Sequence, residues 1–497
     1  MDITDQVSLM SNIARNNEPL LHTAVYLEMI GKDKADLESK QLEVEGELNN
    51  YGISFRRLNL RQREGFRCIA PGGFNALGDQ YERILPASSV ANLFPFCYSG
   101  KTDAKGFYLG KDKYGSNILV DFQKRSEDKT NANVVILGNS GQGKSYLLKL
   151  ILTNLRESGM SIICLDPEEE YQELSNNLQG CYIDLLEGKY FINVLEPKLW
   201  NDTEEEDENA PKAFRTTARI SQHISFLIDF FSSYRPFQYM ELALLEIMLR
   251  KFYSSLGLDD DSDLSDLTSK DYPILSDFYQ MLEDERKSYL IKGKEIYSKE
   301  TLERLMLGLN SICVGNDSKF FNNHTNITSD MFVTFGFKGL LGGSSENLRN
   351  AILFNILSYM SNELLTRGNA VGSLDEFYLF LSNKTAVEYI RNFMKRVRKK
   401  DSMIIIASQN LEDFSQPGIR ELTKPLLAIP SHQFLFNPGN IDGRFYSDNL
   451  QVEDSEYALI KNARQGNCLY RCGMERYNLM VHAPSYKEAL FGRMGGR

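Results

Sequence analysis

The chain has 497 residues, of which 42% are hydrophobic and 25% charged, and its formal net charge at pH 7 is −11. This balance is typical of a folded globular protein and excludes a disordered, collagen-like or coiled-coil chain. No apolar run approaches the roughly 18–20 residues that span a bilayer, and the acidic net charge disfavours a protein that coats nucleic acid non-specifically. The first thirty residues lack a basic segment followed by an apolar one, so no secretory signal is predicted.

The seven cysteines are odd in number, scattered and without a C-x-x-C pair, which favours a reducing compartment over a disulfide framework. The five histidines are isolated in the sequence, so no metal cluster is predicted. We interpret the cysteines as small buried apolar residues.

Residues 1–125 are predicted to form a small α+β module. A strand at His22–Ile30, a charged helix at Lys32–Asn50 and a strand at Ile53–Leu58 have the order of half a ferredoxin-like unit. A hairpin turning at Lys113–Gly115 follows. The half-unit suggests a longer N-terminal domain that has been shortened.

From Asn131 onward, short apolar strands alternate with helices. Val134–Leu137 is a predicted strand, a helix begins at Ser145, and Ser161–Asp166 is the next strand. This alternation predicts an α/β domain, 126–200 and 320–497, with a mostly parallel sheet and helices on both faces. Its later elements are predicted at Met331–Phe337, Ser345–Leu365, Val371–Phe380, Met403–Ser408, His432–Phe436, Asn467–Cys472 and Arg476–His482.

Residues 201–319 are predicted to be an all-helical insertion in this domain. Phe214–Leu256 and Ile274–Ile312 carry apolar residues at helical spacing. Two acidic segments, Asn201–Asn209 and Leu258–Asp266, are interpreted as solvated loops without a catalytic role.

One motif carries chemistry. The sequence GNSGQGKS matches G-x-x-x-x-G-K-[ST] in full, follows an apolar strand and opens a helix, which is the context that a P-loop requires. Glycines let the backbone turn several N–H groups toward phosphates, and the helix N-terminus adds positive potential. We expect Lys144 to neutralise charge on the β- and γ-phosphates of ATP and the Ser145 hydroxyl to ligate Mg²⁺. The predicted nucleotide-binding residues are Gly138, Asn139, Ser140, Gly141, Gln142, Gly143, Lys144 and Ser145.

A P-loop also needs an acidic partner at the end of a neighbouring strand. Asp375 is predicted to hold Mg²⁺ through water, and Glu376 to orient and deprotonate the attacking water. The alternative for this pair is an exposed helix cap. Asp166 at the end of Ser161–Asp166 is the rival acidic residue, although the Asp-Pro sequence there also ends a strand by backbone geometry alone.

Four further side chains are candidates for contact with the γ-phosphate. Gln409 follows a buried strand and is predicted to sense the γ-phosphate or its water; the alternative is a glutamine that only bonds loop backbone. The basic run Lys395–Lys400 is a solvated helix end, a nucleic-acid contact, or the source of an arginine finger, Arg396 or Arg398, acting across a subunit boundary. Arg464 is a second candidate finger.

Five stretches occur in order along the chain: GNSGQGKS, IICLDPEEEY, FINVLEP, GSLDEFYLF and IIIASQN. Together they resemble the conjugative-transfer ATPases of type IV secretion systems, the VirB-four/TraC-like branch of the HerA/FtsK superfamily. The stretch from Ile84 to Gly110 resembles the lead-in to the motor domain of that family, so about 400 residues take part. The family's longer N-terminal domain is here short, and Phe377-Tyr378 stand where many relatives have a small residue and Trp.

The resemblance implies a RecA-like ATPase that forms hexamers with ATP and Mg²⁺ between subunits. It implies work at the cytoplasmic face of the membrane, with membrane-embedded channel proteins and other secretion ATPases as partners. Lys144 and Ser145 match the family's phosphate and Mg²⁺ residues, and the acidic pair and the strand-end glutamine also match. The alternatives are a HerA/FtsK-type DNA translocase, with DNA as partner, and a structural subunit that binds ATP to hold a complex together. A small-molecule P-loop kinase fits less well, because the insertion and the N-terminal module suggest protein partners.

Overall fold

The computed structural model describes residues 18–50, 52–70, 74–92, 100–184, 187–198, 219–260, 262, 264, 266–292, 296–327, 331–339, 345–381, 384–409, 414 and 419–492. It divides into two compact units, Met1–Cys97 and Tyr98–Arg497. Each unit is described by itself.

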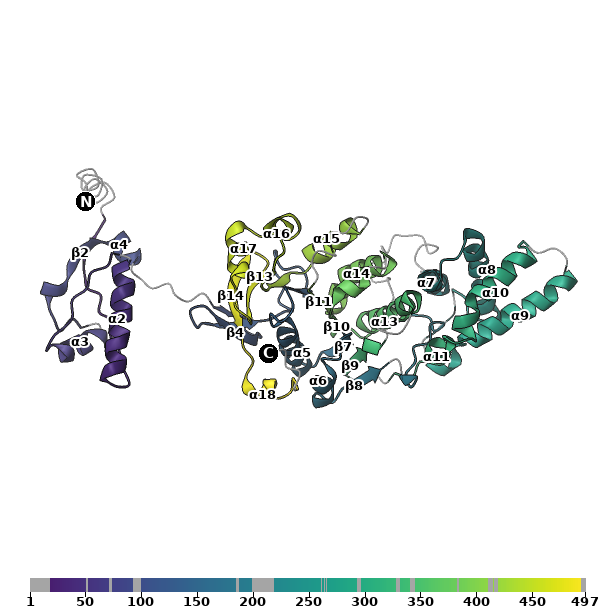
Figure 1. Cartoon of the computed structure of the whole chain (residues 1–497), viewed down its shortest axis with the longest axis horizontal. Helices are drawn as coiled ribbons and strands as arrows, with labels where there is room; N and C mark the ends of the chain where they lie inside the picture. The colour runs from purple at the N-terminus through teal and green to yellow at the C-terminus, as the bar shows by residue number, and fades with distance from the viewer. Residues whose placement is uncertain are drawn as a thin grey trace. The chain divides into compact units, whose positions relative to one another are not determined.

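The first unit contains two strands and a few helices (Figure 1). Its elements are β1 (Leu20–Thr23), α2 (Lys34–Asn50), α3 (Gln62–Ile69), η1 (Asp79–Tyr81), β2 (Arg83–Pro86) and α4 (Ala87–Asn92). The charged helix is where the sequence predicts it. The strand predicted at His22–Ile30 is mostly wrong: β1 shares only His22 and Thr23 with it, and residues 24–30 are irregular. The strand predicted at Ile53–Leu58 is wrong: these residues are irregular, because β2, later in the chain, takes the place beside β1 and pairs with it antiparallel.

A single sheet of twelve strands runs through the second unit, in the order β3-β5-β4-β14-β13-β12-β6-β11-β10-β7-β9-β8. The seven strands from β12 to β8 are parallel to one another, and β13, β14 and β4 extend the sheet antiparallel. The predicted α/β class with a mostly parallel sheet is therefore confirmed. The strands are β3 (Lys101–Thr102), β4 (Phe107–Asp112), β5 (Asn117–Val120), β6 (Val134–Leu137), β7 (Ser161–Asp166), β8 (Cys181–Asp184), β9 (Phe332–Gly336), β10 (Ala370–Leu374), β11 (Met403–Ser408), β12 (His432–Leu435), β13 (Asn467–Cys472) and β14 (Glu475–Val481).

The predicted domain boundary after residue 125 differs from this division. Strand β4 pairs with β14, with Asp112 opposite Leu479, and β5 pairs with β4. Two ion pairs add to this contact: the Nζ atom of Lys101 lies 2.8 Å from Glu475 and that of Lys129 lies 2.9 Å from the same carboxylate. The predicted hairpin is present, but it extends the large sheet.

Helices cover both faces of the parallel sheet. Along β6, Val134 and Ile136 belong to the core under α5 (Lys144–Glu157), while Val135 and Leu137 belong to the core on the opposite face. Successive side chains of a strand point to opposite faces, so a strand covered on both sides is apolar at every position, and all four residues are fully buried. Outside the segment between β8 and β9, further helices in the described part of the unit are α6 (Gln172–Asn177), α13 (Glu346–Thr366), α14 (Lys384–Arg396), α15 (Arg420–Ala428), α16 (Gly443–Leu450), α17 (Asp454–Lys461) and α18 (Ser485–Glu488), with 3-10 turns η6 (Phe377–Phe380) and η7 (Val397–Lys400).

Between β8 and β9 the described residues contain helices and no strand. They are α7 (Arg219–Tyr234), α8 (Tyr239–Ser255), η5 (Ser269–Asp271), α9 (Leu275–Lys292), α10 (Lys299–Cys313) and α11 (Ser318–Phe321). In Figure 1, α8, α9 and α10 lie side by side beyond α13, and α7 contacts α13. The predicted acidic loop Asn201–Asn209 lies outside the described residues, as does part of Leu258–Asp266.

No helix in the described part of the chain is long and apolar enough to cross a bilayer.

Candidate nucleotide-binding site

The P-loop connects the carboxyl end of β6 to the first turn of α5. Gly143 caps α5 in the left-handed conformation, with φ 100°, and Gly141 has φ 72°. At Gly138 a Cβ atom would lie only 2.5 Å from the Cβ of Phe436, so a side chain does not fit there. Glycine is required where the backbone turns this tightly or approaches another chain segment this closely. These glycines thus allow the tight turn that brings the chain from β6 into the N-terminus of α5, where helix N–H groups favour an anion.

Two segments near the C-terminus brace this loop. The backbone N–H of Asn139 donates to the carbonyl oxygen of Asn437 at 2.9 Å, and the N–H of Gly466 donates to the carbonyl oxygen of Gln142 at 2.9 Å. The Asn437 side chain in turn donates to the carbonyl oxygen of Ala463 at 3.2 Å, which joins the two segments. Sequence patterns give no sign of this brace, because its partners lie about 300 residues away along the chain.

Lys144 is buried on the first turn of α5, and its Nζ atom donates to the carbonyl oxygen of Asn139 at 3.0 Å. Burial lowers the pKa of Lys144, and the charges of Glu376, Asp375 and Glu170 oppose that shift. Three carboxyl groups therefore act on the charge of Lys144. A cation bound together with a nucleoside triphosphate offsets the charge of its phosphates.

Asp375 and Glu376 follow β10, two strands from the P-loop strand. Asp375 is buried, its Oδ1 atom accepts the backbone N–H of Glu376 at 2.9 Å, and its Oδ2 atom accepts the hydroxyl of Tyr171 at 2.7 Å. Burial raises the pKa of Asp375, while these two hydrogen bonds and Lys144 lower it. The pair is not an exposed helix cap.

Glu376 occupies a strained backbone position. Its φ is 46° and its ψ 50°, a left-handed conformation that is uncommon for residues other than glycine. This turn ends the predicted strand Val371–Phe380 at Leu374 and begins the 3-10 helix η6. The Glu376 Oε2 atom is buried and has no hydrogen-bond partner within the described residues. Burial, then the charge of Asp375, raises the pKa of Glu376 to about 7, which suits a general base near neutral pH.

Asp166, the rival acidic residue, lies beside Asp375 because β7 and β10 are adjacent and parallel, with Leu165 opposite Leu374. Its carboxylate accepts the backbone N–H of Glu170 at 2.9 Å and that of Tyr171 at 2.8 Å. Burial raises the pKa of Asp166 to about 7. Asp166 thus holds the turn that follows β7.

Gln409, like the P-loop, lies at the carboxyl ends of the parallel strands. It comes directly after β11, in which Ser408 is opposite Leu137, and its side chain is half-buried. The position agrees with contact to a γ-phosphate, and among the described residues no hydrogen bond of its side chain distinguishes this role from its alternative.

Arg396 and Arg398 lie at the opposite ends of the parallel strands from the P-loop, the amino ends. They precede β11, near the amino end of β6, where the side chain of Asn133 donates to the carbonyl oxygen of Met394 at 3.0 Å. Both arginines are exposed. Within one chain they are therefore a strand length away from the P-loop.

Arg464 lies on the P-loop side. It is exposed and stands two residues before Gly466, whose backbone N–H bonds the P-loop. The three candidate arginines are thus divided between the two edges of the sheet.

Tyr171 is the site residue that sequence reasoning missed. Its side chain is fully buried, and its hydroxyl reaches from the turn after β7 to the carboxylate after β10. The one signal for it is that IICLDPEEEY, among the five matching stretches, ends on this tyrosine.

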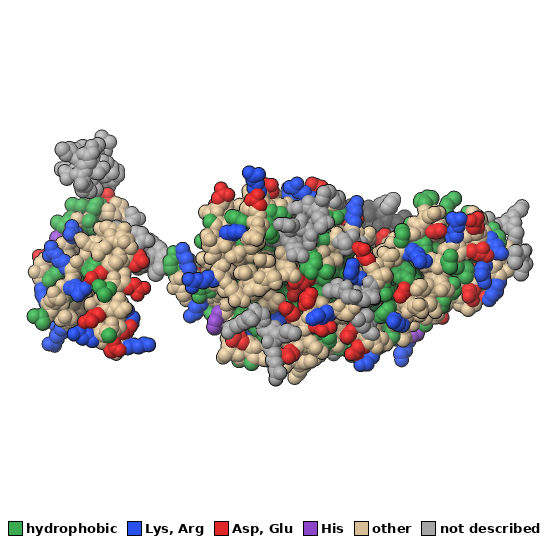
Figure 2. All heavy atoms as spheres, in the orientation of Figure 1, with side chains coloured by type: hydrophobic (Ala, Val, Ile, Leu, Met, Phe, Trp, Pro, Cys, Tyr) green, Lys and Arg blue, Asp and Glu red, His purple; other side chains and the backbone are tan. Residues whose placement is uncertain are grey.

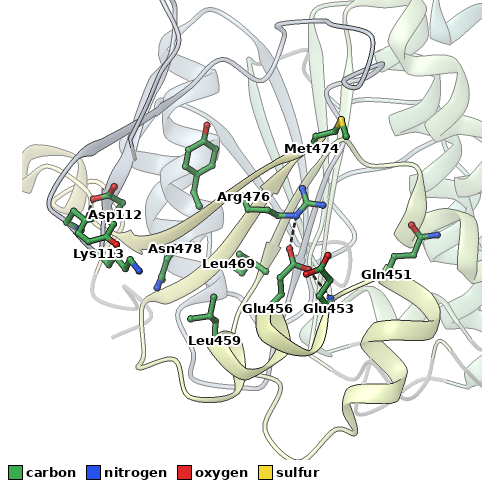
Figure 3. Close-up of a pocket in the computed structure, with 12 residues that line it drawn as sticks. Asp112, Lys113, Gln451, Glu453, Glu456, Leu459, Leu469, Met474, Arg476 and Asn478 are labelled. Carbon is green, nitrogen blue, oxygen red and sulfur yellow. Dashed lines mark hydrogen bonds and ion pairs between the residues drawn. The ribbon is translucent and has the colours of Figure 1, made fainter. Parts of the chain in front are cut away.

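A separate hollow of about 570 Å³ lies between the tip of the β4–β5 hairpin, α17 and β14 (Figure 3). No residue that lines it belongs to the P-loop or the acidic pair. Two of its charged groups pair with each other: the Nε atom of Arg476 lies 2.7 Å from Glu456. We assign it no role in nucleotide binding.

The arrangement fits ATP and Mg²⁺. The glycine cradle, the helix N-terminus and Lys144 suit phosphates, and the buried Glu376 Oε2 atom, which has no partner in the described part of the chain, suits a bound water. Within the described residues no group of three or more His, Cys, Asp or Glu side chains is placed to hold a metal ion by itself. Ser145, half-buried on α5, and Asp375 would hold Mg²⁺ only together with phosphate oxygens and water.

A strand, a glycine-rich loop with Lys and Ser at a helix N-terminus, and an acidic pair two strands away define a P-loop nucleotide-binding protein. More narrowly, the chain belongs to the TraG P-loop domain family, whose profile matches residues 106–421, more than half of its length.

Individual relatives agree with this assignment. The structure of VirB4 of Thermoanaerobacter pseudethanolicus superposes with a TM-score of 0.68 at 29% identity, over 78% of this chain and all of that one. An uncharacterized protein of Bacillus anthracis is 23% identical over 495 residues, 89% of this chain and 74% of the relative. Protein TraC of Escherichia coli K12 is 28% identical over 96 residues, 19% of this chain and 11% of TraC. The resemblance to conjugative type IV secretion ATPases is confirmed.

Proposed function

We propose that this protein is an ATP-hydrolysing motor that energises a conjugative or type IV secretion apparatus. The observation that carries the proposal is that the P-loop and the Asp375–Glu376 pair lie together at the carboxyl ends of the parallel strands, where the Glu376 Oε2 atom is buried without a hydrogen-bond partner among the described residues. ATP and Mg²⁺ are its proposed ligands.

In the proposed mechanism each group has one role. The P-loop N–H groups and Lys144 bind the phosphates, and Ser145 and Asp375 hold Mg²⁺, which offsets phosphate charge. Glu376 accepts a proton from the attacking water, a step for which its raised pKa is suited. Gln409, at the same edge, is proposed to orient that water or contact the γ-phosphate.

The assembly is proposed to be a homo-hexamer with nucleotide between subunits, working at the cytoplasmic face of the cell membrane. Membrane-embedded channel proteins and other secretion ATPases are its proposed partners. The support is the family membership and the similarity to VirB4. Exposed arginines at the far edge of the sheet add to it, because only a neighbouring subunit would bring them to a γ-phosphate.

A DNA translocase is the second candidate, and the charge distribution favours the secretion motor over it. On the face shown in Figure 2, basic and acidic side chains are interspersed over the described part of the chain, and the net charge is −11. A translocase of duplex DNA needs a basic surface. Hydrolysis that is stimulated by DNA in a salt-sensitive way would favour the translocase.

The test separates nucleotide binding from chemistry. Lys144→Ala should lose ATP binding while circular dichroism shows the parent fold, and Lys287→Ala, on the exposed face of α9, serves as control. Glu376→Gln should bind ATP·Mg²⁺ about as well as the parent but hydrolyse it roughly 10²–10⁴-fold more slowly. Full hydrolysis by either site variant would contradict the assigned site. Binding without turnover in the parent would favour an ATP-binding structural subunit.

A further inference from the structure

The turn after β7 forms a continuous chain of contacts to the proposed Mg²⁺ ligand. Asp166 ends β7 and accepts two successive backbone N–H groups, from Glu170 and Tyr171, at 2.9 and 2.8 Å. These bonds hold the turn closed and fix where the Tyr171 ring begins. The Tyr171 backbone carbonyl then accepts the N–H of Ser175 at 2.8 Å, which ties the same residue to α6.

The Tyr171 ring is fully buried between this turn and α5. The Nζ atom of Lys149, on α5, lies 5.5 Å from the centre of the ring. A phenol ring held at both its backbone and its face has one orientation, and in that orientation its hydroxyl lies 2.7 Å from Asp375 Oδ2.

Asp375 therefore has one donor on each oxygen. The Glu376 N–H binds Oδ1 and the Tyr171 hydroxyl binds Oδ2. The Glu376 N–H is next to Asp375 in the chain and moves with it whenever β10 moves. The Tyr171 hydroxyl comes from the turn after another strand, so of these two donors it is the Tyr171 hydroxyl that connects the carboxylate to the rest of the site.

We propose that Tyr171, held in place by Asp166, is a positioning residue that orients the Asp375 carboxylate toward Mg²⁺. This inference rests on the proposed function, because it concerns the Mg²⁺ side of the same nucleotide site. It also joins the roles of the two acidic strand ends, since Asp375 faces the metal and Asp166 holds the residue that orients it. Groups that orient a metal ligand typically change metal affinity 10- to 100-fold when they are removed.

The experiment measures nucleotide binding and does not depend on turnover. Binding of a fluorescent ATP analogue to the full chain is titrated in EDTA and again over a range of Mg²⁺ concentrations. Tyr171→Phe keeps the ring and removes only the hydroxyl. It should bind the analogue in EDTA within about twofold of the parent and need roughly 10-fold more Mg²⁺ to reach half of the Mg²⁺-dependent gain.

A matched control removes another buried tyrosine hydroxyl. The Tyr253 hydroxyl, in the helical segment, donates to the carbonyl oxygen of Leu195 at 2.6 Å. Tyr253→Phe should lower the melting temperature and leave the Mg²⁺ requirement at the parent value. A Tyr171→Phe variant that loses affinity equally with and without Mg²⁺ would overturn the proposal, since a purely structural tyrosine behaves that way.

Asp166→Asn is the second variant and keeps the proposal testable if Tyr171→Phe does not fold. An amide has one acceptor oxygen where the carboxylate has two, so one of the two turn bonds is lost and the Mg²⁺ requirement should rise in the same selective way. Where both variants fold, the double variant should need no more Mg²⁺ than Tyr171→Phe, because both act along one path. Additive effects would overturn the proposed path.

The outcomes also separate this inference from the proposed function. A parent protein that binds no nucleotide would contradict the proposed function and the inference together. A parent with Mg²⁺-dependent binding and a Tyr171→Phe variant with the same Mg²⁺ requirement would contradict the inference alone.

Discussion

At the residue scale, the main feature of the site is the coupling between Lys144 and the carboxyl groups near it. Burial lowers the pKa of Lys144, and the charges of Glu376, Asp375 and Glu170 oppose that shift. Burial, then the charge of Asp375, raises the pKa of Glu376 to about 7, and the charge of Lys144 opposes this rise. Lys144 and Glu376 thus each shift the titration of the other.

A second residue of interest is His432, buried at the start of β12. Its Nδ1 atom lies 2.8 Å from the Tyr470 hydroxyl, and its ring packs edge-on against Phe122 at 5.0 Å. Burial, then the nearby charges of Lys101, Lys129 and Arg125, lowers the pKa of His432 to about 3. The unfolded chain therefore binds a proton below about pH 6.5 that the folded chain does not bind.

Stability should consequently fall as the pH drops from about 6.5 toward 3. His432→Phe keeps a ring and removes the titration, so its free energy of unfolding should depend less on pH. Between pH 7.5 and 5.5 the free energy of unfolding of the parent should fall by roughly 1.4 kcal/mol more than that of His432→Phe. Denaturant unfolding at the two pH values measures this, with His22→Gln in the other unit as control. An equal fall in the free energy of unfolding of the two proteins would show that His432 is protonated in the folded chain.

At the scale of elements, the P-loop helix depends on the end of the chain. The C-terminal segment runs along α5: the backbone N–H of Ala483 donates to the Tyr146 hydroxyl at 3.0 Å, and the Lys149 Nζ atom donates to the Phe491 carbonyl oxygen at 3.3 Å. Lys487 forms an ion pair with Glu157 at the other end of the helix. These contacts cover the face of α5 that points away from the sheet.

Phe491 is the apolar anchor of this segment. It is fully buried, and its ring lies edge-on to Tyr146 at 5.4 Å. Phe491→Ala should lower the free energy of unfolding by about 3–5 kcal/mol, because a buried aromatic ring is replaced by a cavity. Tyr486→Ala, in the same segment but 63% exposed, should change it by less than about 0.5 kcal/mol. Denaturant unfolding of the two variants measures the difference, and equal effects would show that the segment is not packed on α5.

At the scale of the whole molecule, the second compact unit places one set of candidate residues at each edge of its sheet. The P-loop, the acidic pair, Gln409 and Arg464 lie at the carboxyl edge of the parallel strands. Arg396 and Arg398 lie at the amino edge. An arginine at the amino ends of the strands can act on a nucleotide only in an assembly in which those strand ends contact the P-loop of a neighbouring subunit. Arg464, by contrast, lies beside the P-loop of its own chain.

Mixing of variants distinguishes these arrangements. Glu376→Gln and Arg396→Ala subunits should each be nearly inactive alone, and a true finger accounts for up to roughly 10³–10⁵-fold of turnover. Mixed rings should regain part of the activity, because some interfaces pair an intact base with an intact arginine. The measurement is ATP hydrolysis of mixtures whose co-assembly is verified by size in solution.

The same mixing is repeated with Arg398→Ala and Arg464→Ala. A residue that acts within its own subunit gives no recovery when it is mixed with Glu376→Gln, since no combination restores a complete site. Lack of recovery for Arg396 and Arg398, with recovery for Arg464, would contradict the division of roles suggested by the two sheet edges.

Local sequence pattern was enough to predict several elements and the central motif. The strands Val134–Leu137, Ser161–Asp166, Met403–Ser408 and Asn467–Cys472 have the predicted bounds. The first three are parallel strands buried on both faces, and such strands are nearly continuous apolar runs between turns. The P-loop was equally evident, since its chemistry needs fixed residues at fixed spacing within eight positions.

Features that depend on partners far along the chain emerged only from the folded protein. The hairpin at Lys113–Gly115 joins the large sheet because β14, more than 350 residues later, supplies the edge with which it pairs. Asp166 and Asp375 are rival acidic strand ends in the sequence, and only the folded chain, in which β7 and β10 are adjacent, shows that one holds a turn while the other accepts the Tyr171 hydroxyl. The hydrogen bonds between strands join backbone groups, so the local sequence does not show which strands pair. The pairing, and the side-chain contacts that follow from it, are settled only when the chain is folded.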